Sequence, residues 1–262
     1  MERYLGSDPA EVIAHFRRRE PQWFEHAEAV ANYAARVVHR LEVHRGDVRE
    51  LLASVLFQRV AAGFEAMLLL AERGMHTQGL VQRRSILEAL FVLAAIWRKT
   101  ELVEEFLRAD DVRVFHIYKK IKRLPLEVKA ALAPVITAES VDAKLAELKP
   151  KVSGRNTLSV ADYAEAADLL VWYLTDYSFS SEAAHHVAKD LERHVFVDAQ
   201  GEVDGMGWGP EANLASELLS NGIDYVLMAC SAAEGIFAIG PSDELKQMQE
   251  RTNRLMEVDG AG

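Results

Sequence analysis

The chain has 262 residues, half of them hydrophobic, and it carries a formal net charge of -10 at pH 7. This length and composition allow one large buried core, and the negative charge argues against broad electrostatic binding to nucleic acid or to an anionic membrane. The single cysteine, Cys230, excludes an internal disulfide and a cysteine-rich zinc site, so we expect a reduced, cytoplasmic setting.

The N-terminal segment, residues 1–46, is predicted to contain two helices. Asp8 followed by Pro9 is a typical helix start, with the carboxylate as the cap and the proline in the first turn. Pro21 begins the second helix, in which apolar residues recur at helical spacing until about His44. The segment has no apolar run followed by a small-residue cleavage site, so we expect no secretory signal.

Residues 47–194 are predicted to form the main helical region. The expected helices run from Asp47 to Gly74, from about Thr77 to Arg98, from Thr100 to before Pro125, from Leu126 to Pro150 with a break at Pro134 and a cap at Thr137, and from Ser159 through Tyr177 towards His194. The stretch 149–157 is the most loop-like and is the best hinge candidate. The most apolar run, 85–97, is too short to cross a bilayer.

Residues 195–210 differ from the rest because their pattern is not helical. Val195–Val197 and Glu202–Val203 flank an Ala-Gln-Gly turn, which predicts a small hairpin or an ordered loop. Residues 211–262 return to helix, and the first of these C-terminal helices contains small residues that would let another helix approach closely: Ala229, Ser231, Ala232, Ala233 and Gly235. We expect this helix to pack on the core or to form a dimer interface.

These patterns predict an all-α fold, a multi-helix bundle with a small β-hairpin near residues 195–204, in a single domain over residues 1–262. The core is expected from the three helices that contain Leu51–Leu70, Arg84–Trp97 and Tyr177–His185.

The helix Arg84–Trp97 contains one charged residue after its opening arginine, Glu88. An ionised carboxylate inside an apolar core is costly unless it is paired and hydrogen-bonded. Arg84 lies one helical turn earlier and is the expected partner. The pair is either a surface stripe on an otherwise buried helix or a buried polar centre, and we favour the buried centre because the neighbours of Glu88 in the sequence are apolar.

A second polar stripe is expected about ninety residues later. Tyr177, Ser181 and His185 are spaced i, i+4 and i+8, which places them on one face if the segment is helical. Set opposite Arg84 and Glu88, these groups would satisfy the buried carboxylate and fix the tautomer of the imidazole.

The segment FQRVAAGFEAMLLLAERGMHTQGLVQRRSILEALFVLAAIW, followed by YSFSSEAAHH, resembles the domain-of-unknown-function family 5677. Its members carry an Arg-Ser-x-x-Glu helix and later a Tyr-x-x-x-Ser-x-x-x-His helix, usually with a bulky aliphatic residue where this chain has Ser180. The matching positions are Arg84, Ser85, Glu88, Tyr177, Ser181 and His185. The resemblance covers residues 51–194 and implies a helical bacterial protein with a recurring polar cluster, and no established activity.

Two functions remain open on these observations. In the first, the protein is an interaction or sensing module, linked to stress or phage defence, and the polar cluster only fixes how two helices pair. In the second, it is a hydrolase, with His185 as general acid or base and Arg84 stabilising a developing anion. Tyr177 and Ser181 would then position the substrate, and Glu88 would orient the other groups.

The ribonuclease version of the second function rests on analogy with helical HEPN enzymes, which carry an Arg, then four to six residues, then a His on one helix. Arg19 and His26 meet that count, but Pro21 lies between them. Glu182 and His185 have the spacing of a bridged metal centre, but the second such motif is missing. We therefore expect no metal and no cofactor, a protein partner or a second copy of the chain, RNA as the alternative partner, and no membrane.

Overall fold

The computed structural model describes Tyr4 and residues 8–153, 157–185, 195–207, 209–211, 215–240 and 242–259. Its α-helices are α1 (Pro9–Arg19), α2 (Pro21–Arg40), α3 (Val48–Ala71), α4 (His76–Arg98), α5 (Leu102–Lys122), α6 (Leu126–Leu132), α7 (Ala138–Val152), α8 (Val160–Ala166), α9 (Leu170–Trp172), α10 (Ser178–His185), α12 (Ala215–Ile236) and α13 (Asp243–Asp259). A π-helical turn, η1 (Tyr173–Tyr177), joins α9 to α10.

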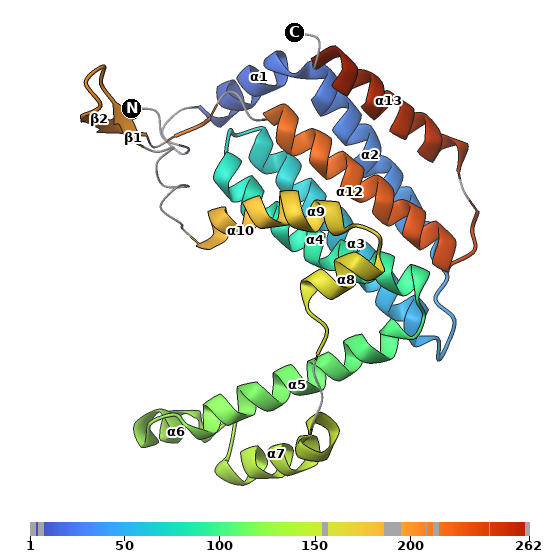
Figure 1. Cartoon of the computed structure of the whole chain (residues 1–262), viewed down its shortest axis with the longest axis vertical. Helices are drawn as coiled ribbons and strands as arrows, with labels where there is room; N and C mark the ends of the chain where they lie inside the picture. The colour runs from blue at the N-terminus through green and yellow to red at the C-terminus, as the bar shows by residue number, and fades with distance from the viewer. Residues whose placement is uncertain are drawn as a thin grey trace.

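The core lies where α2, α3, α4 and α12 pack side by side (Figure 1). The helix α12 contacts the other three, so the long apolar helix after Pro210 is a central element of the bundle. The largest fully buried side chains of the chain include Phe24, Tyr33, Phe57, Phe64, Phe91 and Tyr225. The predicted fold class, all-α with a small hairpin, is confirmed.

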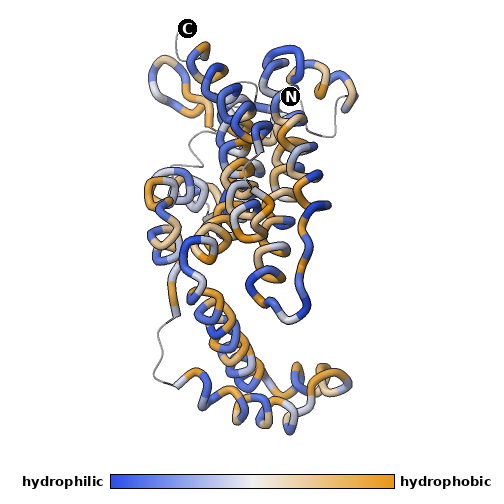
Figure 2. The backbone as a smooth tube through the Cα atoms, turned by 90° about the vertical axis from the view of Figure 1, so that its right-hand side faces the viewer, coloured by the Kyte–Doolittle hydropathy of each residue, from blue (hydrophilic) through white to orange (hydrophobic). Residues whose placement is uncertain are grey.

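Helices α5, α6 and α7 form an arm, residues 102–152, that stands off the bundle in both views (Figures 1 and 2). Val141 and Leu148 are buried where α7 packs on α5, and neither belongs to the main core. Most other side chains of the arm are exposed or half-buried. The arm therefore has little apolar contact of its own to hold it together.

Several helix starts follow the caps expected from the sequence. The side chains of Asp8, Asp47 and Thr137 accept hydrogen bonds from backbone amides in the first turns of α1, α3 and α7. Ser159 and Asp162 form a reciprocal capping box at the start of α8. Local polar side chains thus determine where these helices begin.

The helix expected from Ser159 to Tyr177 is wrong as a continuous element. It ends after about two turns, because Asp168 adopts a left-handed backbone conformation with φ 60°. Aspartate is one of the few non-glycine residues that tolerate this region. The chain then restarts as α9 and η1, and η1 packs on α4 (Figure 1).

The predicted hairpin is confirmed. Strand β1 (Val195–Val197) pairs antiparallel with β2 (Val203–Met206), with an irregular register after Phe196. The carboxylate of Asp198 accepts hydrogen bonds from the amides of Gln200 and Glu202, each at 2.9 Å, and so closes the turn. The predicted continuation of the preceding helix, residues 186–194, lies outside the described residues.

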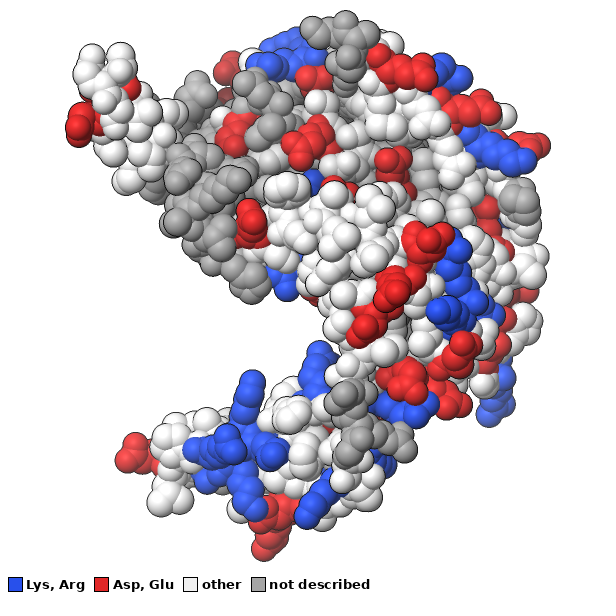
Figure 3. Space-filling view, in the orientation of Figure 1, with Lys and Arg blue, Asp and Glu red and all other residues white. Residues whose placement is uncertain are grey.

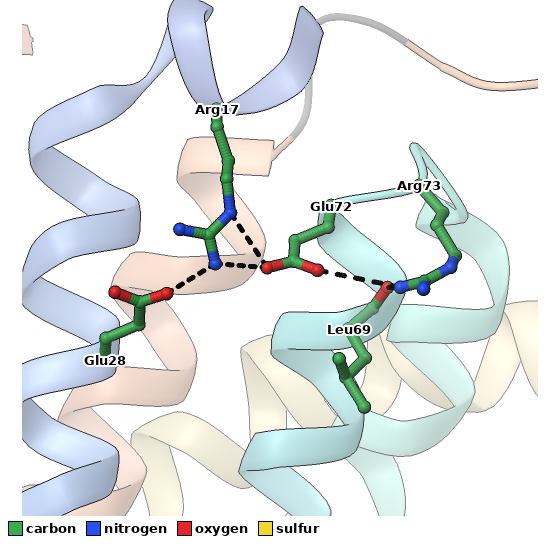
Figure 4. A network of polar contacts seen from close by, with 5 residues as sticks. All are labelled: Arg17, Glu28, Leu69, Glu72 and Arg73. Carbon is green, nitrogen blue, oxygen red and sulfur yellow. Dashed lines mark hydrogen bonds and ion pairs between the residues drawn. The ribbon is translucent and has the colours of Figure 1, made fainter. Parts of the chain in front are cut away.

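An ion-pair network holds the end of α3 against α1 and α2 (Figure 4). Arg17 donates hydrogen bonds to Glu28 and to Glu72, and its Nε lies 3.0 Å from the Glu72 carboxylate. Glu72 is buried, and its other oxygen lies 3.6 Å from Arg73. A buried carboxylate with cations on two sides avoids the cost of an unpaired charge.

Among the described residues, one helix, α3, meets the length and hydropathy of a membrane-crossing segment, with a mean hydropathy of 1.4. Half of that stretch is buried inside the bundle, as expected for the core helix of a globular protein.

Candidate functional site

A surface cluster formed by Arg84, Glu88 and Tyr177 joins α4 to the end of η1. The Nε of Arg84 donates to a Glu88 oxygen at 3.1 Å, and the Tyr177 hydroxyl donates to the same oxygen at 2.9 Å. The guanidinium of Arg84 also lies over the Tyr177 ring, 5.1 Å from its centre. The Tyr177 ring in turn stacks on that of Tyr173.

The expectation that Glu88 is buried is wrong. Its side chain is 44% exposed, and that of Arg84 is 25% exposed. The apolar neighbours in the sequence face the bundle, whereas Glu88 lies on the side of α4 that η1 and α10 cover only in part. The surface cluster therefore shares its charge with solvent.

A separate buried network, formed by Arg83, Asp176, Ser180 and Tyr225, lies next to the surface cluster. Arg83 is 2% exposed, and its Nε donates to the Ser180 hydroxyl at 2.7 Å. Ser180 donates to the backbone carbonyl of Asp176 at 2.6 Å, and the Asp176 carboxylate accepts from the Tyr225 hydroxyl at 2.8 Å. One chain of hydrogen bonds thus connects α4, α10, η1 and α12.

Sequence reasoning selected Arg84 and missed Arg83, although a signal was present. One turn after Arg83 come Ile86 and Leu87, which are fully buried, whereas Arg84 is followed one turn later by Glu88. An arginine in line with apolar residues at i+3 and i+4 faces the core. Ser180 is the residue that departs from the family pattern. Its hydroxyl accepts the hydrogen bond from the buried guanidinium of Arg83.

The surroundings shift the proton affinities of these groups. Burial, reinforced by the bond to Glu88, raises the pKa of Tyr177, so its phenol stays protonated. Burial and the Asp176 charge likewise raise the pKa of Tyr225. Burial, with the nearby Asp176, raises the pKa of Asp224 to about 6. Both tyrosines therefore act as hydrogen-bond donors here at neutral pH.

The π-helical turn explains how one short segment supplies both groups of contacts. A π-turn closes i→i+5 contacts and usually interrupts an α-helix at a site where side chains must be re-aimed. Here the Ser178 hydroxyl donates to the Tyr173 carbonyl, five residues back, at 2.9 Å. Asp176 consequently points towards α12 while Tyr177 points towards α4.

The other two residues of the predicted stripe, Ser181 and His185, have no described contact with Arg84 or Glu88. Ser181 is half-buried on α10, one turn after Tyr177, and Glu182 is exposed. The backbone of His185 ends α10, but its side chain lies outside the described residues. The predicted meeting of His185 with Arg84 therefore stays a prediction.

The two residues of the HEPN-like pair lie on different helices, with the proline between them. Arg19 ends α1, whereas His26 lies in α2 and is buried, with Nε2 2.9 Å from the Thr252 hydroxyl on α13. Since that hydroxyl already donates to the Met248 carbonyl, His26 is the donor to it. Within the described parts of the chain, no three Asp, Glu, His or Cys side chains are grouped closely enough to hold a metal ion.

Together, the fold and these contacts define an all-α bundle in which two arginines of one core helix fasten a π-helical crossing segment. The chain matches the family of unknown function DUF5677 over residues 50–203, more than half of its length. It belongs to that family, and the matched region spans α4, the arm, η1 and α10. Comparison with curated proteins and with solved structures finds no match.

Proposed function

We propose that this protein is an interaction module: a rigid helical bundle that presents the arm to a protein partner. The observation that carries the proposal is an open, mostly apolar groove of about 530 Å³ on the arm, between the end of α5, α6 and the start of α7. An exposed apolar concavity is the usual form of a binding site for another molecule.

The hydrogen bonding of the polar residues supports a structural role for them. Arg83, Ser180 and Tyr225 are buried; Arg83 bonds to Ser180 and, at 3.4 Å, to Glu217, while Ser180 and Tyr225 bond to Asp176. Such networks commonly specify how helices pair. On this proposal the two arginines keep the η1–α10 segment in place on the bundle.

A hydrolase remains the second candidate, because one observation favours it. Arg84 and Glu88 reach solvent beside a π-helical turn, and π-turns often occur at functional sites. In this function Arg84 would stabilise an anion and His185 would transfer a proton.

The two functions are separated by unfolding and activity measurements on wild type, Arg84→Gln and His185→Gln. The module predicts that wild type neither cleaves RNA nor harms cells on overexpression, and that the variants differ from it only in stability. A wild type that is toxic or cleaves RNA, with equally stable variants that do neither, would replace the module by the hydrolase.

A further inference from the structure

The groove on the arm has an aliphatic floor. It is lined by Ile121 of α5, by Leu126 and Leu132 of α6, by Ile136 just before α7 and by Val141 in the first turn of α7. Leu126 is 82% exposed, which is a large exposed fraction for a leucine. The helix α6, to which it belongs, has no buried residue. The floor therefore leaves apolar area in contact with water that a ligand would cover.

The rim of the groove is basic. Lys122 and Lys129 line it directly beside one carboxylate, Asp142, and Lys119, Lys120 and Arg123 belong to the same end of α5. Of these five cations, Lys122 pairs with Asp142 at 2.7 Å, and the other four form no ion pair within the described parts of the chain. Positive charge at this rim is therefore available to a partner.

The outer part of the arm, residues 113–151, carries a net charge opposite in sign to that of the rest of the chain. Residues 113–151 contain nine Lys or Arg and four Asp or Glu, a net charge of +5, so the remainder of a chain of net charge -10 carries -15. Figure 3 shows the Lys and Arg side chains gathered over the arm. This separation favours an acidic partner for the arm and disfavours one for the bundle.

The lining distinguishes between two acidic partners. Single-stranded nucleic acid is usually bound by basic grooves that carry aromatic side chains, on which the bases stack. The lining of this groove contains no aromatic residue and is mainly aliphatic. An aliphatic floor with a cationic rim instead matches an amphipathic helix, whose apolar residues at i, i+3 and i+4 enter the groove while its acidic residues meet the rim.

We propose that the groove between α5, α6 and α7 binds an acidic amphipathic helix of a partner protein. This assignment rests on the proposed interaction function and names its docking surface and the chemistry of its partner. Because the arm has a small core of its own, the bound helix also completes the packing of α6 against α5 and α7.

The test uses the full chain and a synthetic peptide of about 18 residues, five helical turns, with leucines on one face and glutamates elsewhere. Its affinity is measured by fluorescence anisotropy beside two control peptides, one with lysines for the glutamates and one with serines for the leucines. We expect the acidic amphipathic peptide to bind at least about tenfold more tightly than either control, with an affinity that falls as salt rises.

Two charge-reversed variants localise the binding. Lys129→Glu changes a cation of the rim and should weaken binding about tenfold or more. Lys149→Glu makes the same charge change on α7 away from the groove lining, and should alter affinity less than about threefold. Lys149 is exposed and Lys129 is half-buried on the arm, so hydrogen exchange of residues 102–152 is the check that the arm of each variant is folded.

Three results would overturn the assignment. The first is equal binding of all three peptides, or no binding; the second is an equal loss in both variants. The third is evidence that the groove binds a different ligand. That ligand would be RNA if a single-stranded RNA binds more tightly than the peptide, or a second copy of the chain if wild type is a dimer that Lys129→Glu converts to a monomer. Each of these results rejects the acidic helix as the ligand of the groove. The proposed interaction function is rejected only if the RNA is also cleaved.

Discussion

At the scale of single residues, the two adjacent arginines of α4 have different roles. Arg83→Met removes a buried charged donor to Ser180, and we expect the free energy of unfolding to fall by about 2 kcal/mol. Arg84→Met removes one member of a solvent-exposed i,i+4 pair and should cost less than about 1 kcal/mol. Urea unfolding of the two variants checks this order; a larger loss for Arg84→Met would show that the surface cluster is the structural one.

His26 is expected to make stability depend on pH. Burial, and next the charge of Arg251, lowers its pKa from 6.5 to about 4. Between these two values the unfolded chain binds a proton that the folded chain does not, so stability is complete above pH 6.5 and falls as the pH drops towards 4. The slope is at most about 1.4 kcal/mol per pH unit.

The measurement compares wild type with His26→Gln by urea unfolding at pH 7 and pH 5. The variant lacks the titrating ring, so the difference in stability between the two proteins should shrink by about 2 kcal/mol at the lower pH. Wild-type and variant curves that stay parallel would mean that His26 titrates alike in both states.

At the scale of elements, the contact of α12 with α3 depends on a glycine. A Cβ added at Gly222 would lie 2.8 Å from the ring of Phe64 and closer still to Met67. We expect Gly222→Ala to destabilise the fold by about 1 to 3 kcal/mol, because neither neighbour has free space to move into. Gly205→Ala in β2, where the nearest atom is 3.8 Å away, is the matched control and should be neutral; equal melting temperatures for both variants would contradict the close packing.

The elements that the sequence predicted well are those with a local cause. Asp8, Asp47 and Thr137 act as caps within their own first turns, so neighbouring residues suffice to recognise them. The break at Asp168 was missed because helical periodicity does not reveal a left-handed backbone conformation at a single aspartate. Periodicity also could not show that α5 to α7 leave the bundle, since an apolar face does not reveal what covers it.

The candidate site was predictable to a similar extent. Helical spacing and the family resemblance pointed to Arg84, Glu88 and Tyr177, which the structure brings into contact. The burial of Glu88 was misjudged because it depends on where the η1–α10 segment crosses α4, which is a tertiary property. The buried bond from Arg83 to Ser180 joins residues 97 positions apart, and no local pattern pairs them.

At the scale of the whole molecule, the bundle and the arm should differ in local stability. The helices α3, α4 and α12 bury most of the large side chains, whereas the arm has few buried residues. Hydrogen exchange followed by mass spectrometry should therefore show slow amides in the bundle and amides that exchange faster in residues 102–152. Uniform protection over both parts would mean that the arm unfolds only with the bundle.

The most direct test of the central claim is the same exchange measurement with and without the acidic amphipathic peptide. If the arm is the binding surface and the polar residues of α4 are structural, protection should rise in residues 113–142 and stay unchanged around Arg84, Glu88 and Tyr177. Protection that rises instead around these three residues, with an unchanged arm, would contradict the account and place the functional site at the surface cluster.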